Sequence, residues 1–306
     1  IYSAWPNCFD RKEMHLKVLE CYRLGQELRY YSQNSFITGS GIEILARIIS
    51  THSFRGGTGK SNTTANIAVL TAKAGFRVGV IDTDIQSPGI HVLFRMEERE
   101  MAYSLNDYLW NKCRIEQAAF DVTSKCIGKI SSDSDSPKLF LIPSSLKTGE
   151  IARILREGYD VARLNDGFQE LIRQLRLDFL FIDTHPGVNE ETLLSIAISD
   201  ALILLVRPDQ QDFQGTAVAV ELARKLDVPE LFVVVNKVPA GMDPAVLCVQ
   251  VESLYSTEVL AVLPLSIEMA RTGSGDIFCN RYPDHPLTHG LKSVVERLIG
   301  PMKSSI

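Results

Sequence analysis

Phe54-Arg-Gly-Gly-Thr-Gly-Lys-Ser-Asn62 is the stretch of sequence that decides the fold of this chain. It follows a short apolar run at residues 47–51 and opens a helical pattern at residues 61–74. In a strand–loop–helix of this kind, the glycines let backbone N–H groups close on an anion, and the helix N-terminus adds partial positive charge. The stretch therefore predicts a phosphate-binding loop.

The residues of this loop have separate predicted roles. Lys60 is expected to reach the β- and γ-phosphates of a nucleotide, and the Ser61 hydroxyl is expected to ligate Mg²⁺. The common form of the motif has glycine at position 54, where this chain has phenylalanine. The residues expected to bind the nucleotide in this loop are Gly56, Gly57, Thr58, Gly59, Lys60, Ser61 and Asn62.

The rest of the chain alternates short apolar runs with longer amphipathic stretches. The runs are mostly continuous, which is typical of strands buried on both faces. They occupy residues 77–82, 138–143, 178–183, 201–206, 231–236 and 259–264, and helical patterns occupy 152–174, 190–198, 213–226, 245–254 and 287–299. This alternation predicts an α/β fold with a doubly wound, mostly parallel sheet covered by helices on both faces. We expect an N-terminal extension of helix plus linker at residues 1–44, a main domain at 45–300 and a tail at 301–306.

Composition limits the classes of function. The 32 Lys+Arg and 37 Asp+Glu give a net charge of −5, which argues against a chain that binds polyanions over its whole surface. The apolar runs are far shorter than the roughly 20 residues that span a bilayer, and the first residues do not resemble a secretory signal. The six cysteines form no CxxC pair, so we expect free thiols in a reducing cytoplasm. The chain begins with Ile1 rather than Met, which suggests a processed product or a fragment.

Carboxylates follow two of the predicted strands. Asp82 ends the run at residues 77–82, Asp84 lies two residues beyond it, and Asp183 ends the run at 178–183. Because strand ends in open α/β sheets face the ligand crevice, Asp82 and Asp183 are expected to hold Mg²⁺, and Asp84 to orient the attacking water. Gly187 is expected to approach the γ-phosphate. Each Asp taken alone could equally be a helix cap or a turn residue.

In combination and order, these motifs resemble the deviant Walker A ATPases of the MinD/ParA family. The resemblance covers residues of about 45 to 300. It rests on the Arg-Gly-Gly-Thr-Gly-Lys-Ser loop, on Asp82-Thr-Asp84 (similar to switch I), on Asp183-Thr-His-Pro-Gly187 (similar to switch II) and on Val235-Asn-Lys237. It implies a P-loop NTPase fold, ATP and Mg²⁺ as ligands, and a homodimer that forms face to face around two ATP molecules and separates after slow, partner-stimulated hydrolysis.

The resemblance also assigns roles to Arg55 in the loop and to residues outside it. Arg55 replaces the family's usual lysine and is hypothesised to act in trans on the partner's phosphates, the alternative being a solvated loop arginine. Asn236 is expected to pair with the adenine edge or to cap its strand, and Pro264 to pack beside the base. Residues 207–215 form either a dimer-contact loop or an ordinary loop with Asp212 as N-cap. His185 stands where relatives often have a small residue or Pro, and could be a catalytic base or a bystander.

The sequence does not decide whether the nucleotide cycle acts on a membrane, on DNA or on a partner protein. A C-terminal apolar stripe could bind membrane or pack on the sheet; its residues are Leu291, Val294, Val295, Leu298 and Ile299. An arginine-rich segment could bind DNA or form a solvated mixed-charge face; its arginines are Arg153, Arg156, Arg163, Arg173 and Arg176. The expected function is a switch that positions a cargo or regulates a partner protein. The alternative is a metabolic or metal-handling ATP-dependent enzyme, although the absence of CxxC argues against an iron–sulfur carrier.

Overall fold

The computed structural model describes residues 22–23, 26, 46–128, 136–272 and 275–300. Most of the helix expected at residues 11–31, the linker after it and the tail at 301–306 lie outside these residues. The division of the chain into extension, domain and tail therefore stays a prediction.

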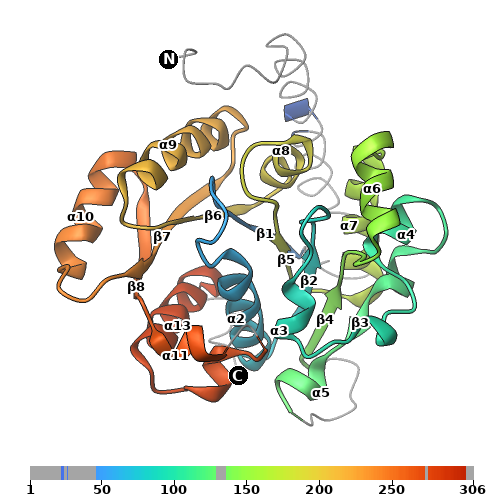
Figure 1. Cartoon of the computed structure of the whole chain (residues 1–306), viewed down its shortest axis with the longest axis horizontal. Coiled ribbons are helices and arrows are strands. Elements are labelled where there is room, and N and C mark those ends of the chain that lie inside the picture. Colours follow the sequence, from blue (N-terminus) through green and yellow to red (C-terminus); the bar gives the residue numbers. More distant parts are fainter. Residues whose placement is uncertain (1–21, 24–25, 27–45, 129–135, 273–274, 301–306) are drawn as a thin grey trace, which may run out of the picture.

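A central sheet organises the described part of the chain (Figure 1). Its strand order is β3-β4-β2-β5-β1-β6-β7-β8, and every neighbouring pair is parallel except β3 with β4. The strands are β1 (Arg47–His52), β2 (Arg77–Asp82), β3 (Phe120–Asp121), β4 (Lys138–Ile142), β5 (Phe179–Asp183), β6 (Ala201–Val206), β7 (Glu230–Val238) and β8 (Glu258–Pro264). The seven predicted strands are confirmed. The two-residue β3 is too short to leave a hydrophobic pattern in the sequence.

Helices cover both faces of this sheet and bury a separate apolar core on each. One face carries α2 (Lys60–Lys73), α3 (Ile90–Leu93), α5 (Thr123–Cys126), α12 (Phe278–Arg281) and α13 (Pro286–Ile299). The other carries α4 (Leu105–Leu109), α6 (Thr148–Glu157), α7 (Val161–Leu175), α8 (Glu190–Ala197), α9 (Gln210–Lys225) and α10 (Pro244–Tyr255). This arrangement confirms the predicted doubly wound α/β fold.

One predicted helix is wrong. Residues 152–174 were expected to form a single helix, but the chain breaks between α6 and α7 at Gly158, whose φ is 67°. Asp160 then caps α7 by accepting a hydrogen bond of 2.9 Å from the backbone N–H of Ala162. The mixed-charge pattern runs through this break, so periodicity alone does not reveal it.

The C-terminal apolar stripe is part of the core. Leu291, Val294, Val295 and Leu298 of α13 are buried in the cluster that α13 shares with α2 and β8. The alternative of packing on the sheet is therefore confirmed for this stripe, and the stripe is not available to a membrane surface. Among the described residues, no helix combines the length and apolar character needed to cross a bilayer.

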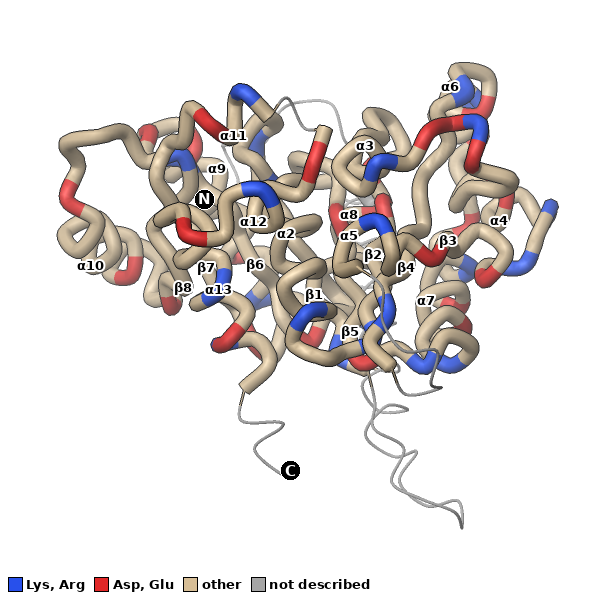
Figure 2. The backbone as a smooth tube through the Cα atoms, turned by 90° about the horizontal axis from the view of Figure 1, so that it is seen from below, with Lys and Arg blue, Asp and Glu red and all other residues tan. Residues whose placement is uncertain are grey.

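Two arginines of α6 and α7 are engaged with their neighbours. Arg153 lies 3.6 Å from the ring centroid of Trp110 and pairs with Glu157 at 3.0 Å. Arg163 lies over the Tyr108 ring and donates to the Tyr108 carbonyl. Figure 2 shows acidic and basic residues side by side on these helices. This pattern favours the solvated mixed-charge face over a DNA-binding patch.

A glycine in α9 explains the phenylalanine at the first position of the phosphate loop. The Phe54 ring packs against Gly215, and a Cβ at Gly215 would lie 2.2 Å from the ring. A side chain at position 215 is therefore incompatible with the present position of Phe54. This contact fixes the loop against α9.

We expect Gly215→Ala to lower the free energy of unfolding by about 1–3 kcal/mol, because the added methyl group must displace Phe54. The matched control is Gly149→Ala in α6, where a Cβ would meet no heavy atom within 4 Å. We expect that control to raise the free energy of unfolding by about 0.4–1 kcal/mol, because alanine restricts the unfolded chain more than glycine does. Urea unfolding measures both. Equal effects of the two substitutions would contradict the packing argument.

Candidate functional site

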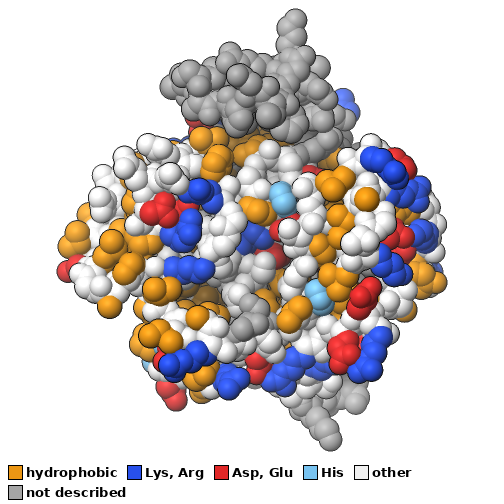
Figure 3. Space-filling model, in the orientation of Figure 1, with side chains coloured by type: hydrophobic (Ala, Val, Ile, Leu, Met, Phe, Trp, Pro, Cys, Tyr) orange, Lys and Arg blue, Asp and Glu red, His pale blue; other side chains and the backbone are white. Residues whose placement is uncertain are grey.

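The candidate site lies where the central strands β1, β2 and β5 end. β5 lies between β1 and β2 and pairs with both, so that the loops after the three strands emerge side by side. The loop after β1 carries the predicted phosphate-binding residues, and it leads into α2 at Lys60. Figure 3 shows a hollow near the centre of the molecule with charged side chains and histidines around it.

A buried ion pair joins the start of α2 to the end of β5. Lys60 Nζ lies 2.9 Å from Asp183 Oδ1, and the two side chains are 7% and 1% exposed. Thr64, one turn further along α2, donates to the same carboxylate oxygen at 3.3 Å. The ammonium group expected to bind phosphate is therefore held at the base of the loop by a carboxylate.

Asp82 stands beside Asp183 because the two residues are in register on β2 and β5. The Asp82 carboxylate accepts hydrogen bonds from the backbone N–H groups of Asp84 at 3.0 Å and Gly89 at 3.2 Å. Burial, followed by the charges of Asp183 and Asp84, raises the pKa of Asp82 to about 8. Carboxyl groups are thus crowded together at this edge of the sheet.

This donor set fits Mg²⁺. Carboxylate and hydroxyl oxygens are the ligands that the ion prefers, and it usually keeps several waters while binding one or two protein groups and the substrate phosphates. Asp82, Asp183 and Ser61 supply such oxygens. No group of three or more His, Cys, Asp or Glu residues in the described part of the chain is placed to form an all-protein cage. A site completed by nucleotide phosphates and water is consistent with both facts.

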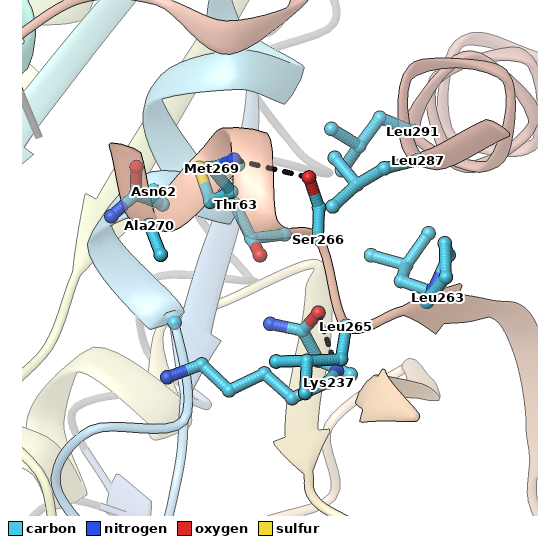
Figure 4. A pocket seen from close by; sticks show the side chains of 13 residues that line it. Asn62, Thr63, Lys237, Leu263, Leu265, Ser266, Met269, Ala270, Leu287 and Leu291 are labelled. Carbon is cyan, nitrogen blue, oxygen red and sulfur yellow. Dashed lines mark hydrogen bonds between the residues drawn. The ribbon is translucent and has the colours of Figure 1, made fainter. Parts of the chain in front are cut away.

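A cavity of about 240 Å³ lies beside the loop. It is lined by Gly59, Asn62, Asn236 and Pro264 and by apolar residues of β8, α11 (Ile267–Thr272) and α13 (Figure 4). Its volume is below the 300–1,000 Å³ typical of whole-ligand pockets, so it suits one end of a nucleotide, the base. Asn236 and Pro264, the two residues predicted to contact the base, both lie at this cavity.

Asn236 and Lys237 also support the loop. Asn236 Nδ2 donates to the Thr58 carbonyl at 2.8 Å, and a Cβ at Gly59 would lie 2.5 Å from that nitrogen. Gly59 has a φ of 96°, a backbone conformation that favours glycine. Lys237 Nζ donates to the Gly57 carbonyl at 2.6 Å. The role of Asn236 toward adenine stays a prediction.

Arg55 lies outside the buried part of the site. Its side chain is 44% exposed; it donates to Gln211 Oε1, and its Nε lies 3.9 Å from Asp212 Oδ1. Asp212 is itself bound by Arg207, whose Nε and Nη2 donate to the two carboxylate oxygens at 2.7 and 3.0 Å. Arg55 is thus held over the N-terminal turn of α9.

The N-cap predicted for this helix is wrong. α9 begins at Gln210, and its cap is Asp209, which accepts a hydrogen bond of 2.9 Å from the backbone N–H of Asp212. The sequence offers Asp at both positions, and the capping geometry alone decides between them. Asp212 is instead the carboxylate shared by Arg207 and Arg55.

The loops after β2 and β5 contact each other through a histidine. His185 Nδ1 lies 2.7 Å from Asp84 Oδ1. In the same loop, the Gly187 N–H donates to the Ser53 carbonyl at 3.1 Å, just before the phosphate loop. Gly187 therefore contacts the residue before Phe54, while its approach to a γ-phosphate stays a prediction, and the His185 ring is largely covered and bonded to Asp84. Sequence reasoning gave no contact for His185, Gln211 or Lys237, because their partners lie on other elements.

His52, at the end of β1, lies under the site and is fully buried. Thr184 Oγ1 donates to the Thr51 carbonyl, so His52 Nδ1 must carry the proton in its 2.9 Å contact with Thr184. His52 Nε2 has no hydrogen-bond partner among the described residues. Burial, followed by the charge of Lys60, lowers the pKa of His52 to about 3.

Comparisons with known proteins show the family and the fold of this chain. A family model described as ParA, NUBPL iron-transfer P-loop NTPase, matches residues 45–299. An uncharacterized ATP-binding protein of Methanocaldococcus jannaschii is 25% identical over 85% of this chain and 90% of its own length. An iron-sulfur cluster carrier protein of Pseudomonas fragi is 28% identical over 75% of this chain and 76% of its own. The septum site-determining protein MinD of Pyrococcus horikoshii was solved with Mg-ADP, and it superposes on this chain with a TM-score of 0.69. The superposition covers 86% of this chain and all of that protein at 19% identity, and it therefore shows the fold.

The buried His52 predicts a loss of stability in acid. Between the ordinary pKa of 6.5 and about 3, the unfolded chain binds a proton that the folded chain does not, so the free energy of unfolding falls as pH falls. From about pH 7.5 to about pH 5 the wild type is expected to lose about 2 kcal/mol more than His52→Asn, which keeps a donor at the Nδ1 position. Urea unfolding at the two pH values measures the difference. Parallel losses in the two proteins would show that His52 is not held neutral.

Proposed function

The chain belongs to the ParA family of P-loop NTPases, and from this premise we propose that it is a switch that dimerises with ATP and hydrolyses it to position a cargo or regulate a partner protein. Members of the family are ATPases in general. The observation that carries the proposal is that the two cationic side chains of the loop lie in different surroundings. Lys60 is buried inside the site on Asp183, whereas Arg55 is carried by the same loop on the surface.

In this proposal the chain acts mainly by positioning and by neutralising charge. The Lys60 ammonium exchanges its contact with Asp183 for the β- and γ-phosphate oxygens, and the loop N–H groups bind the same phosphates. Ser61, Asp82 and Asp183 would hold Mg²⁺, which when bound offsets negative charge on the phosphates. Asp84 orients the attacking water.

Arg55 completes the site of a second copy in this proposal. Its guanidinium has five N–H donors in a planar fork, which suits phosphate oxygens. The contacts to Gln211 and Asp212 hold it at the surface of the monomer, next to α9. In a homodimer that places this surface against a partner's phosphates, Arg55 exchanges its contacts with Gln211 and Asp212 for phosphate oxygens of the partner's site.

A metal-handling role is the second candidate, because the matching family model and the Pseudomonas fragi relative carry iron-related descriptions. Iron–sulfur clusters need thiolates. Burial raises the pKa of Cys113 to about 11, of Cys126 to about 12 and of Cys279 to about 11, and it also raises the pKa of Cys248. Among the described residues, no group of three or more His, Cys, Asp or Glu side chains is placed to hold a metal ion, which favours the switch over a carrier that binds a cluster within one chain. Cluster chromophores retained by the folded protein after anaerobic reconstitution would reverse this ranking.

The first test measures mass in solution for the wild type and Asp84→Ala, each without nucleotide, with ADP and with ATP–Mg²⁺. We expect a dimer only with ATP, and a longer-lived dimer for Asp84→Ala because hydrolysis is slowed while binding is kept. Light scattering coupled to size exclusion gives the masses. A mass that does not respond to nucleotide would overturn the switch proposal.

The second test concerns Arg55. Arg55→Ala is expected to lose the ATP-dependent dimer and to lower turnover by about 10²-fold or more, as removal of a trans-acting arginine does in other NTPases. Arg55→Lys should retain part of both, since it keeps the charge and loses the fork. Arg99→Ala is the matched control, because Arg99 is 81% exposed and pairs with Glu97, two residues away in the chain. Dimerisation and turnover of Arg55→Ala at wild-type levels would refute a role in trans.

A further inference from the structure

His185 is placed to control the carboxylate that the proposed hydrolysis uses. β2 and β5 are neighbours with Asp82 opposite Asp183, so the residues two positions further on, Asp84 and His185, also lie side by side. His185 Nδ1 is 2.7 Å from Asp84 Oδ1. Because a carboxylate only accepts hydrogen bonds, Nδ1 carries the proton in this contact.

The hydrogen bonds of Asp84 fall on one of its two oxygens. Oδ1 accepts from His185 Nδ1 and from the backbone N–H of Ser87 at 3.1 Å. Within the described ranges, no donor is bonded to Oδ2. The carboxylate is therefore fixed in orientation through Oδ1, while the lone pairs of Oδ2 stay available to a water molecule.

His185 is itself held in place. Its carbonyl accepts a hydrogen bond of 3.3 Å from Thr192 Oγ1 of α8, and its ring is only 22% exposed. Two residues further on, Gly187 is bonded to Ser53, the residue before Phe54. The histidine thus connects the loop after β2 to a loop that is anchored both on α8 and on the phosphate loop.

We propose that His185 is a positioning residue for hydrolysis: its Nδ1–H orients Asp84 so that Oδ2 holds the attacking water. The inference rests on the proposed ATPase role of Asp84. In the step, the water oxygen bonds to the γ-phosphorus as the bond from that phosphorus to the bridging oxygen breaks, and ADP leaves with the electron pair. One water proton stays on the hydrogen phosphate, and the other is released to solvent.

The test compares single-turnover ATP hydrolysis and ATP affinity in His185→Ala and His185→Asn. The alanine variant is expected to hydrolyse bound ATP about 10-fold to 100-fold more slowly, with its Kd for ATP within about twofold of the wild type, because a misplaced reacting group slows the step without weakening binding. The asparagine variant should recover most of the rate, because Asn Nδ2 is a donor that lies two bonds from Cβ, as His Nδ1 does. His289→Ala, at an exposed histidine of α13, is the control and should match the wild type.

A double-mutant cycle identifies the partner through which His185 acts. In an Asp84→Ala background, His185→Ala should cause no further loss of rate. The inference is overturned by a wild-type rate in His185→Ala, by a loss confined to affinity, by a failure of asparagine to recover the rate, or by an equal further loss in the Asp84→Ala background. If instead the wild type hydrolyses ATP no faster than Lys60→Ala, the proposed ATPase cycle itself falls.

Discussion

The buried contact between Lys60 and Asp183 is the interaction on which the rest of the site depends. Taking both charges out of water costs several kcal/mol per ion, and the pair offsets this cost only through its short, well-oriented contact. A hydrophobic pair would stabilise the fold at least as well. A buried ammonium group kept at the base of a glycine-rich loop therefore favours a function over a purely structural role, because an incoming phosphate can take the place of Asp183.

The surrounding elements make that exchange workable. Asp82 and Asp183 stand crowded in register at the end of two parallel strands, and burial, followed by the charges of Asp183 and Asp84, raises the pKa of Asp82. A divalent cation and a phosphate together would relieve this crowding and supply Lys60 with a new partner. Asn236 and Lys237 hold the loop from the other side through the Thr58 and Gly57 carbonyls. The loop is thus supported from the end of β7, beside the cavity that suits a base.

Most of the fold and the location of the site could be predicted from the sequence. Buried parallel strands give continuous apolar runs, and the glycine-rich loop and the strand-end carboxylates occur in fixed order along the chain. The break between α6 and α7 at Gly158 could not be predicted, because the charge pattern continues across it. The contact between His185 and Asp84 could not be read either, since it requires β5 to lie beside β2, and sequence order does not give strand order. For the same reason, Gly215 gives no sign that it makes room for Phe54.

The most direct test of the central claim is titration calorimetry of Mg·ATP into the wild-type protein and into Lys60→Ala. The account predicts saturable binding of one nucleotide per chain to the wild type. It predicts loss of that binding in the variant, because the loop then lacks the ammonium group that exchanges its contact with Asp183 for a contact with phosphate. Absence of binding to the folded wild type, or equal binding by Lys60→Ala, would contradict it.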